Sequence, residues 1–290
     1  MSGAAGTTVA VLAALAAAGS FGAGVALQYR QAQLTPPARR APVRLIAYLA
    51  RQRLWLAGIA LAAAAYGLQA VALALAPLAL VAPVVATDLL FALPLAARWS
   101  RRPMRLRDWA GCMLAGGGVA MFLAASPPSA GRSDAPALDW ALAFAAVALV
   151  AAAAVIAARV THGPARAGLL ALASGAVFGT CAALNLSVTR LLGTVRIGHI
   201  LGHWQLWALI ALGTAGLVLS SSAFQAGSLS ASLPVIDTAE PVSAVLLGTL
   251  VFDEHLASSP AGLSLQLAGS AAAVAGIIVL GRSPVAWRAS

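Results

Sequence analysis

Two carboxylates stand inside an apolar stretch that is long enough to cross a bilayer. Asp237 and Glu240 lie within residues 228–251, and Pro234 and Pro241 flank them. On a helix, residues three apart share one face, so both side chains should point the same way. An ionised acid at the centre of a membrane helix costs about 2.5–3.5 kcal/mol and usually serves a function. We therefore expect this pair to bind a proton or a cation.

The two prolines predict a break in this helix, because each removes a backbone hydrogen bond and crowds the preceding turn. Two acids this close should not both carry a charge, which suits coupling to protons. A structural alternative is that Asp237 begins a half-helix after the break and caps its free amides. Both interpretations stay open for Asp237, whereas function is favoured for Glu240.

Asp88 is the third acid in an apolar segment, between Pro83 and Pro94. We expect a carboxylate near the middle of the membrane that faces the other half of the chain. The alternative is an acid paired with the nearby arginines. Arg98 is ten residues further on, about 15 Å along a helix, which exceeds the reach of the two side chains.

Three further polar residues are predicted to line the same cavity. Tyr66 and Gln69 lie three apart in one apolar segment, and Asn185 lies in another. The alternative is that such residues only join helices, a contribution of about 0.6 kcal/mol on average. The predicted site therefore consists of Asp88, Asp237 and Glu240 with Tyr66, Gln69 and Asn185.

Composition identifies the elements that must position these residues as membrane helices. Hydrophobic residues make up 61% of the chain and charged residues 9%, against about 25% charged residues in soluble domains. A bilayer needs about 20 apolar residues per helix. On that criterion we predict an all-α membrane protein with nine spans, at residues 8–28, 54–75, 78–97, 108–126, 137–158, 167–189, 204–223, 228–251 and 262–281.

The arginines orient these spans. An external N-terminus makes residues 29–53, 98–107, 159–166 and the C-terminal tail cytoplasmic, and these segments hold 15 of the 18 basic residues, all arginine. Such a bias is typical of cytoplasmic loops. The prediction is a multi-pass protein of the inner membrane with its C-terminus inside. Arginines in short loops also argue against nucleic-acid binding, which needs basic and aromatic residues on a soluble face.

The two halves carry a weak repeat. Shifting residues 76–97 by 151 positions onto 227–248 aligns Pro83 with Pro234, and shifting the next helix by 158 aligns Gly111 with Gly269 and Gly118 with Gly276. On nine spans the matched helices run in opposite directions. We therefore predict two inverted membrane repeats in one unit, residues 1–126 with four helices and residues 127–290 with five, as in many secondary transporters.

The repeated segments resemble the drug/metabolite transporter superfamily with EamA-type repeats. The resemblance rests on Glu240-Pro241, on the acidic turn Asp253-Glu254 and on the glycine-rich last helix, whereas the first repeat has the arginine-rich RWSRRP in place of an acidic turn. It covers most of residues 54–281 and implies a transporter of ten helices, of which this chain lacks the first. The number of spans and the segments FALPL and VAPV are also similar to those of the NIPA-type magnesium transporter branch.

Glycines, cysteines and histidines give three further predictions. Gly175 and Gly179 form a GxxxG motif, which predicts close packing between helices. Cys112 and Cys181 lie in different apolar segments without CxxC spacing, so we expect free, buried thiols. His199 and His203 have helical i, i+4 spacing but no third ligand nearby, so no metal site is predicted.

Enzyme motifs are absent from the sequence, which has no phosphate-binding glycine loop, GxSxG or HExxH. We predict a secondary transporter, without cofactor, that moves a small metabolite, amine or drug-like substrate by alternating access, with proton coupling. The alternatives are a permease for magnesium or another divalent cation, whose hard ion would need several oxygen ligands, and a membrane scaffold that transports nothing. Beyond the bilayer and a small-molecule or cation substrate, the sequence leaves monomer and homodimer open.

Overall fold

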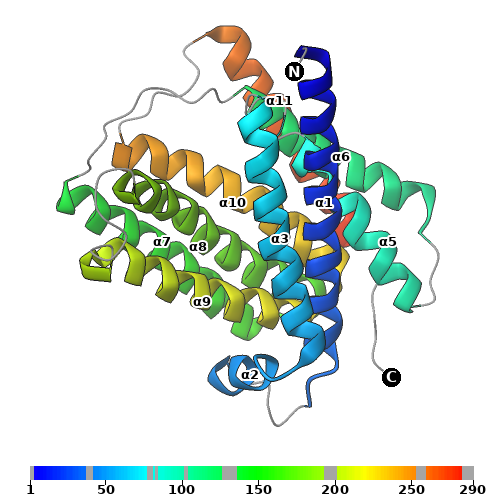
Figure 1. The fold of residues 1–290 in the computed structure, drawn as a ribbon. Coiled ribbons are helices and arrows are strands. Elements are labelled where there is room, and N and C mark those ends of the chain that lie inside the picture. Colours follow the sequence, from blue (N-terminus) through cyan, green and yellow to red (C-terminus); the bar gives the residue numbers. More distant parts are fainter. Residues whose placement is uncertain are drawn as a thin grey trace.

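Every regular element in the described part of the chain is a helix. The structure is a computed structural model and describes residues 3–36, 42–76, 81, 84–100, 104–125, 136–192, 201–252 and 259–282. The long elements are α-helices (Figure 1): α1 Gly3–Gln33, α2 Pro42–Leu49, α3 Arg53–Leu75, α5 Leu89–Ser100, α6 Leu106–Ala124, α7 Ala137–Val160, α8 Gly163–Leu192, α9 Trp204–Ala226, α10 Leu229–Phe252 and α11 Pro260–Gly281.

Six of these helices, α1, α3, α7, α8, α9 and α11, are long and apolar enough to cross a membrane. They coincide with six of the nine predicted spans, so the chain is an α-helical, multi-pass membrane protein. The predicted spans 108–126 and 228–251 match α6 and α10, which contain charged residues, and α5 covers the second part of span 78–97. Residues 78–80, 82 and 83 of that span lie outside the described residues, and the total of nine stays a prediction.

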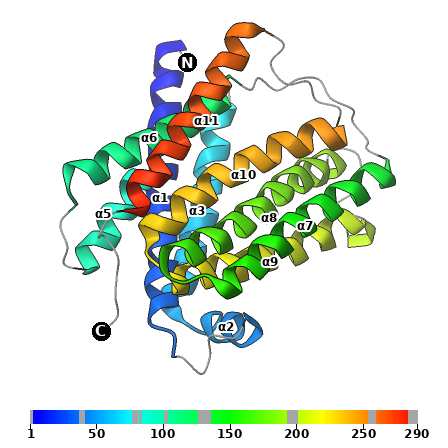
Figure 2. The same cartoon turned by 180° about the vertical axis from the view of Figure 1, so that it is seen from behind.

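The helices form two groups. Helices α7, α8, α9 and α10 lie side by side, and the α1–α3 pair runs at a steep angle to them (Figures 1 and 2). Helices α6 and α11 cross each other in close contact. Gly118 of α6 lies against the backbone of Ala273, and Gly276 of α11 against that of Ala115. Residue numbers rise along one helix as they fall along the other, so α6 and α11 are antiparallel.

Helix α2 differs from the prediction, which places its residues in a cytoplasmic loop. Leu45 and Leu49 are four apart, so they share one helical face. Both are fully buried, in a cluster with Trp55 of α3 and Leu217 of α9. Pro42 occupies the first helical position, where its missing N–H is not needed. This apolar face ties the loop to the helical body.

The predicted break in the second acid-bearing helix is wrong. Helix α10 is continuous from Leu229 to Phe252 with Pro234 and Pro241 inside it. Membrane helices tolerate proline where neighbouring groups satisfy the freed backbone. Each proline removes only the N–H donor to the carbonyl four residues before it, that of Ser230 or of Asp237, and the helix continues through both positions. The corresponding break occurs in the first half instead, where a turn at residues 86–88 precedes α5.

Candidate carboxylate site

The fold brings the three predicted acids together. Asp88 lies directly before α5, and Asp237 and Glu240 lie in the middle of α10. The charge of Asp88 interacts with those of both α10 acids, and the two α10 acids interact with each other. Each side chain is half-buried. Carboxylates far apart in the sequence therefore lie near enough to influence one another's charge.

Asp88 is fixed by the turn that begins α5. Its Oδ1 accepts a hydrogen bond of 2.8 Å from the Leu89 N–H, and its own N–H donates to the Val85 carbonyl. The start of a helix offers free amides and the positive end of the helix dipole, both of which favour a carboxylate. Asp88 has no arginine partner among the described residues; Arg101 and Arg102 of the cytoplasmic cluster lie outside them, so the alternative of an ion pair with that cluster stays open.

Asp237 offers two oxygens without ordinary helical partners. Its Oδ2 is buried and has no hydrogen-bond donor among the described residues. Its backbone carbonyl also lacks the usual donor four residues on, because that residue is Pro241. Since Asp237 lies in mid-helix, the capping role considered from the sequence is wrong. A buried acceptor needs a partner, and a bound cation, ammonium group or proton would supply it.

Glycines hold the α10 backbone at the level of the acids. A Cβ at Gly175 of α8 would lie 2.9 Å from the Ile236 carbonyl oxygen, and one at Gly179 would lie 2.6 Å from that of Glu240. Only glycine permits such an approach, so the predicted close packing at this GxxxG motif is confirmed. The contact sets the height and distance at which Glu240 faces the first half.

Gly22 makes the same kind of contact in the first half. A Cβ there would lie 2.5 Å from the Asp88 carbonyl oxygen and 2.8 Å from the N of the fourth residue after it. At Gly179 the corresponding distances are 2.6 Å to the Glu240 carbonyl oxygen and 2.9 Å to the N of Ala244. Asp88 and Glu240 thus occupy matching packing positions, 152 residues apart and one more than the shift found in the sequence.

Aromatic and thiol side chains lie beside the acids. Tyr66 of α3 interacts electrostatically with Glu240, its side chain is 61% exposed, and Phe21 packs edge-on against its ring at 4.9 Å between centroids. Cys181 of α8 also interacts with Glu240. It is a free thiol as expected, but half-buried, whereas Cys112 is buried as predicted. Sequence reasoning missed Cys181 as a neighbour of the site, although it follows Gly179 by two positions.

The two predicted amides lie on the same helices as Tyr66 and Cys181. Gln69 is half-buried and follows Tyr66 by three positions on α3. Asn185 is exposed and lies one turn beyond Cys181 on α8, where it has interactions of its own. The place of both amides in the site stays a prediction.

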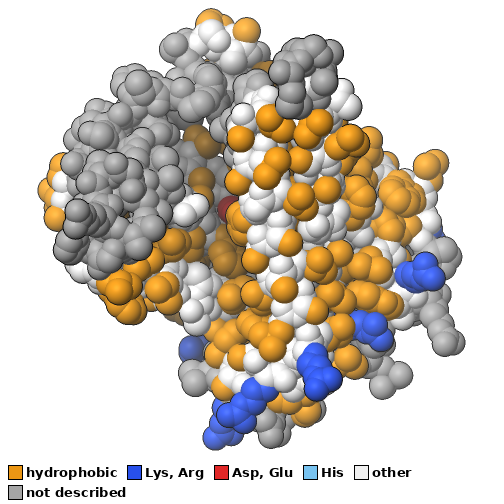
Figure 3. Space-filling model, in the orientation of Figure 1, with side chains coloured by type: hydrophobic (Ala, Val, Ile, Leu, Met, Phe, Trp, Pro, Cys, Tyr) orange, Lys and Arg blue, Asp and Glu red, His pale blue; other side chains and the backbone are white. Residues whose placement is uncertain are grey.

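The molecular surface is hollowed at one acidic side chain. Figure 3 shows an acidic side chain at the bottom of a hollow beside the α1–α3 pair, while arginines lie along the lower and right edges of this face. Within the described residues, no group of three His, Cys, Asp or Glu side chains could hold a metal ion. His199 and the Asp253-Glu254 turn lie outside these residues.

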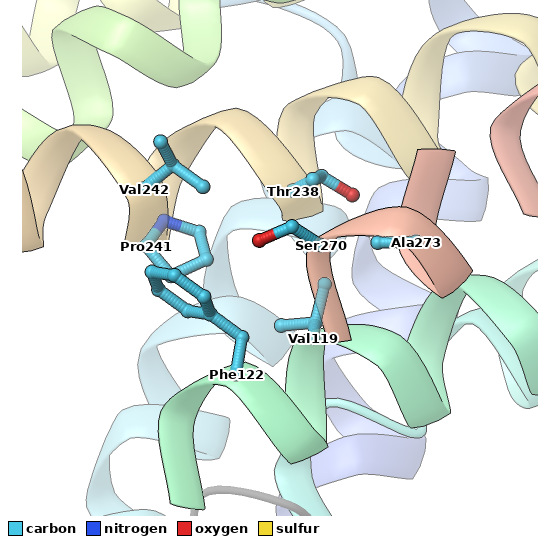
Figure 4. A pocket seen from close by; sticks show the side chains of 7 residues that line it. All are labelled: Val119, Phe122, Thr238, Pro241, Val242, Ser270 and Ala273. Atoms are coloured by element: carbon cyan, nitrogen blue, oxygen red, sulfur yellow. The ribbon is translucent and has the colours of Figure 1, made fainter. Parts of the chain in front are cut away.

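A second, smaller space lies on a different face of α10. A pocket of about 10 Å³ lies between α6, α10 and α11 (Figure 4). Its two hydroxyls, on Thr238 and Ser270, bond to carbonyls of their own helices. The remaining lining is apolar and consists of Val119, Phe122, Pro241, Val242 and Ala273. Ligand pockets usually exceed about 300 Å³, so this is a packing space and not the substrate site.

Comparison with known proteins places the chain in a family. It is 31% identical over 249 residues to an uncharacterized protein of Corynebacterium glutamicum, and the match covers 85% of each chain. The chain belongs to the family of that protein. No family model matches the sequence, and no solved structure matches the fold. Function must therefore be argued from the site.

Proposed function

We propose that this protein is a secondary transporter of the drug/metabolite type, which moves small amine-bearing solutes across the inner membrane in exchange for protons. The observation that carries the proposal is the cluster of Asp88, Asp237 and Glu240, contributed by both halves. Among the described residues these acids have no basic partner, so the solute or the proton supplies the positive charge. Intramembrane acids of this kind usually mark substrate and proton pathways.

Contacts between α6 and α11 support the proposal of inverted halves. The shift of 158 residues that aligns these helices turns the contact of Gly118 with Ala273 into that of Gly276 with Ala115. It likewise turns the contact of Gly269 with Phe122 into that of Gly111 with Leu280. A two-fold axis perpendicular to two antiparallel helices would produce this pairing. Transporters with such an axis bind substrate near the midplane between their halves.

The packing of Gly22 on Asp88 and of Gly179 on Glu240 supports the same axis at the acids. In the proposal, each half contributes one acid at a matching position, and Asp237 adds a third. Exchange between two conformations would then expose the acids to one side of the membrane at a time. The arginine-rich ends of the helices would face the cytoplasm, with the N-terminus outside.

Transport by purified protein in proteoliposomes tests the proposal. We expect a panel of small amines to drive protons out of vesicles, as reported by a pH-sensitive dye inside. Glu240→Gln should abolish this signal, and Asp139→Asn, at the start of α7, should retain it. Magnesium uptake without a proton gradient would instead favour the cation permease. Absence of both fluxes, with the protein correctly inserted, would leave a membrane scaffold.

A further inference from the structure

The last turns of α1 bridge α5 and α9. Tyr29 packs edge-on against Phe224 of α9, with 5.9 Å between ring centroids. The Arg30 guanidinium lies over the Trp99 ring of α5, 4.8 Å from its centroid. Gln33 then donates from Nε2 to the Phe224 carbonyl and, over 3.0 Å, to that of Gly227. The end of α1 thus joins two other helices.

This bridge lies on the arginine-rich side of the acids. Gly22 of α1 packs at the level of Asp88, and Tyr29 is seven residues further along, about 10 Å at the rise of a helix. On α5, Trp99 follows Asp88 by eleven residues, about 16 Å. The contacts therefore form a layer between the acid cluster and the cytoplasmic ends of the helices.

A packed core fills the space behind this layer. Leu89, Leu93, Leu233 and Ile236 are at most 5% exposed and belong to one apolar cluster with Tyr29, Phe224 and other buried residues. The acids themselves are half-buried, and the acidic side chain seen in the hollow of Figure 3 lies above the arginines at the lower edge of that face. Protein interiors packed in this way leave no path for water.

We propose that Tyr29, Arg30 and Gln33 of α1, with Trp99 and Phe224, form an inner gate, and that the structure is the state in which this gate is shut and the acids face the opposite side of the membrane. The gate opens when the end of α1 separates from α5 and α9. The Gly22 contact lies at the level of the acids and serves as the fixed point about which this end moves. This gate goes beyond the proposed transport activity.

The chain carries its own reporter for this gate. It has two cysteines, of which Cys112 is buried and Cys181 is half-buried beside Glu240. In a Cys112→Ser background, a small, membrane-impermeant, positively charged methanethiosulfonate reports whether water reaches Cys181. The reagent is added outside vesicles that hold the protein in one or the other orientation, so that it reaches one side of the membrane at a time. We expect Cys181 to react from the side opposite the arginines and not from the arginine-rich side.

Gate variants should change this sidedness. Arg30→Leu and Trp99→Leu should each raise the rate of labelling from the arginine-rich side about tenfold, which corresponds to loss of about 1.4 kcal/mol from a desolvated cation–π contact. Arg30→Lys keeps a cation over the ring and should remain close to the parent protein. Trp109→Leu is the matched control, because Trp109 is 40% exposed on α6. Every variant is first checked for an unchanged elution volume and melting temperature in detergent.

Three results would overturn the gate. The first is equal labelling of the parent protein from both sides, and the second is unchanged sidedness in both Leu variants. The third is the absence of labelling from either side, both at Cys181 and at a second reporter, Tyr66→Cys, at the 61% exposed position of α3. The assay needs no substrate, so a missing amine flux would count against the proposed function and leave the gate result standing.

Discussion

Gly179 packs directly on the peptide carbonyl of Glu240. A Cβ at position 179 would lie 2.6 Å from the carbonyl oxygen and 2.6 Å from the Cβ of Ser243. Backbone atoms cannot move aside as a flexible side chain can, so a larger residue would push α10 away from α8. The position of Glu240 in the membrane therefore depends on a residue of another helix that has no side chain.

Gly179→Ala should lower both stability and transport. Overpacking at a well-packed contact costs about 1–3 kcal/mol, and displacement of the acid should reduce the amine flux at least about tenfold. Gly168→Ala on the same helix is the matched control, because a Cβ there meets nothing within 4 Å. Thermal unfolding in detergent and flux in proteoliposomes measure the two effects. Equal behaviour of both variants would contradict this assignment.

Neutralising Glu240 should remove the dependence of transport on pH. In the proposal, Glu240 exchanges a proton for the ammonium group, so the flux of the parent protein varies with the pH gradient. Glu240→Gln keeps the shape and hydrogen-bonding capacity of the side chain but cannot release a proton. Flux measured across a series of external pH values should become flat and small. A variant with a parent-like pH profile would assign coupling to Asp88 or Asp237 instead.

Truncating Tyr66 should weaken substrate affinity. Its ring is held edge-on by Phe21 beside Glu240, where it can present a face to an ammonium group. A cation–π contact contributes about 0.5–2 kcal/mol, so Tyr66→Ala should raise the KM for the amine roughly twofold to thirtyfold. Tyr66→Phe keeps the ring and should change KM little. If Tyr66→Phe were as impaired as Tyr66→Ala, the hydroxyl and not the ring would be the important group.

The α6–α11 contact predicts equal effects at symmetry-related positions. Gly118→Ala and Gly276→Ala should lower the melting temperature by similar amounts, because each adds a methyl group against the backbone of the other helix. Gly117→Ala is the adjacent control, since a Cβ there meets nothing within 4 Å. It should be neutral or stabilising by up to about 1 kcal/mol through helix propensity. A loss at Gly118 alone would argue against a two-fold axis at this contact.

Much of the fold follows from hydrophobic length, because the bilayer sets one requirement for every span. Helices α3, α7 and α9 begin at Arg53, Ala137 and Trp204, each within a few residues of the predicted start. Helix α2 was missed because its apolar face has only eight residues in which to show a pattern. The continuity of α10 was missed because the effect of Pro234 and Pro241 depends on the groups packed around them. The sequence does not show which groups these are.

The candidate site was only partly accessible from the sequence. The free-energy cost of placing an acid in a membrane helix singles out Asp88, Asp237 and Glu240, because acids in such segments usually have a function. Their proximity could be inferred only through the repeat, and its alignment was one residue short of the register that the glycines define. Cys181 carries no recognisable motif, so its position beside Glu240 became visible only when α8 was packed against α10.

The residues that determine helix packing differ from those proposed to bind the solute. Gly22, Gly175 and Gly179 pack against the backbone at the level of the acids, whereas the side chains at 88 and 240 are the groups that would bind the solute in the proposal. Exchange of an acid for another polar residue would leave helix packing unchanged, while exchange of a glycine would move a whole helix. We expect members of this family to diversify in what they carry by changing the projecting residues, and to keep the three glycines as they do so.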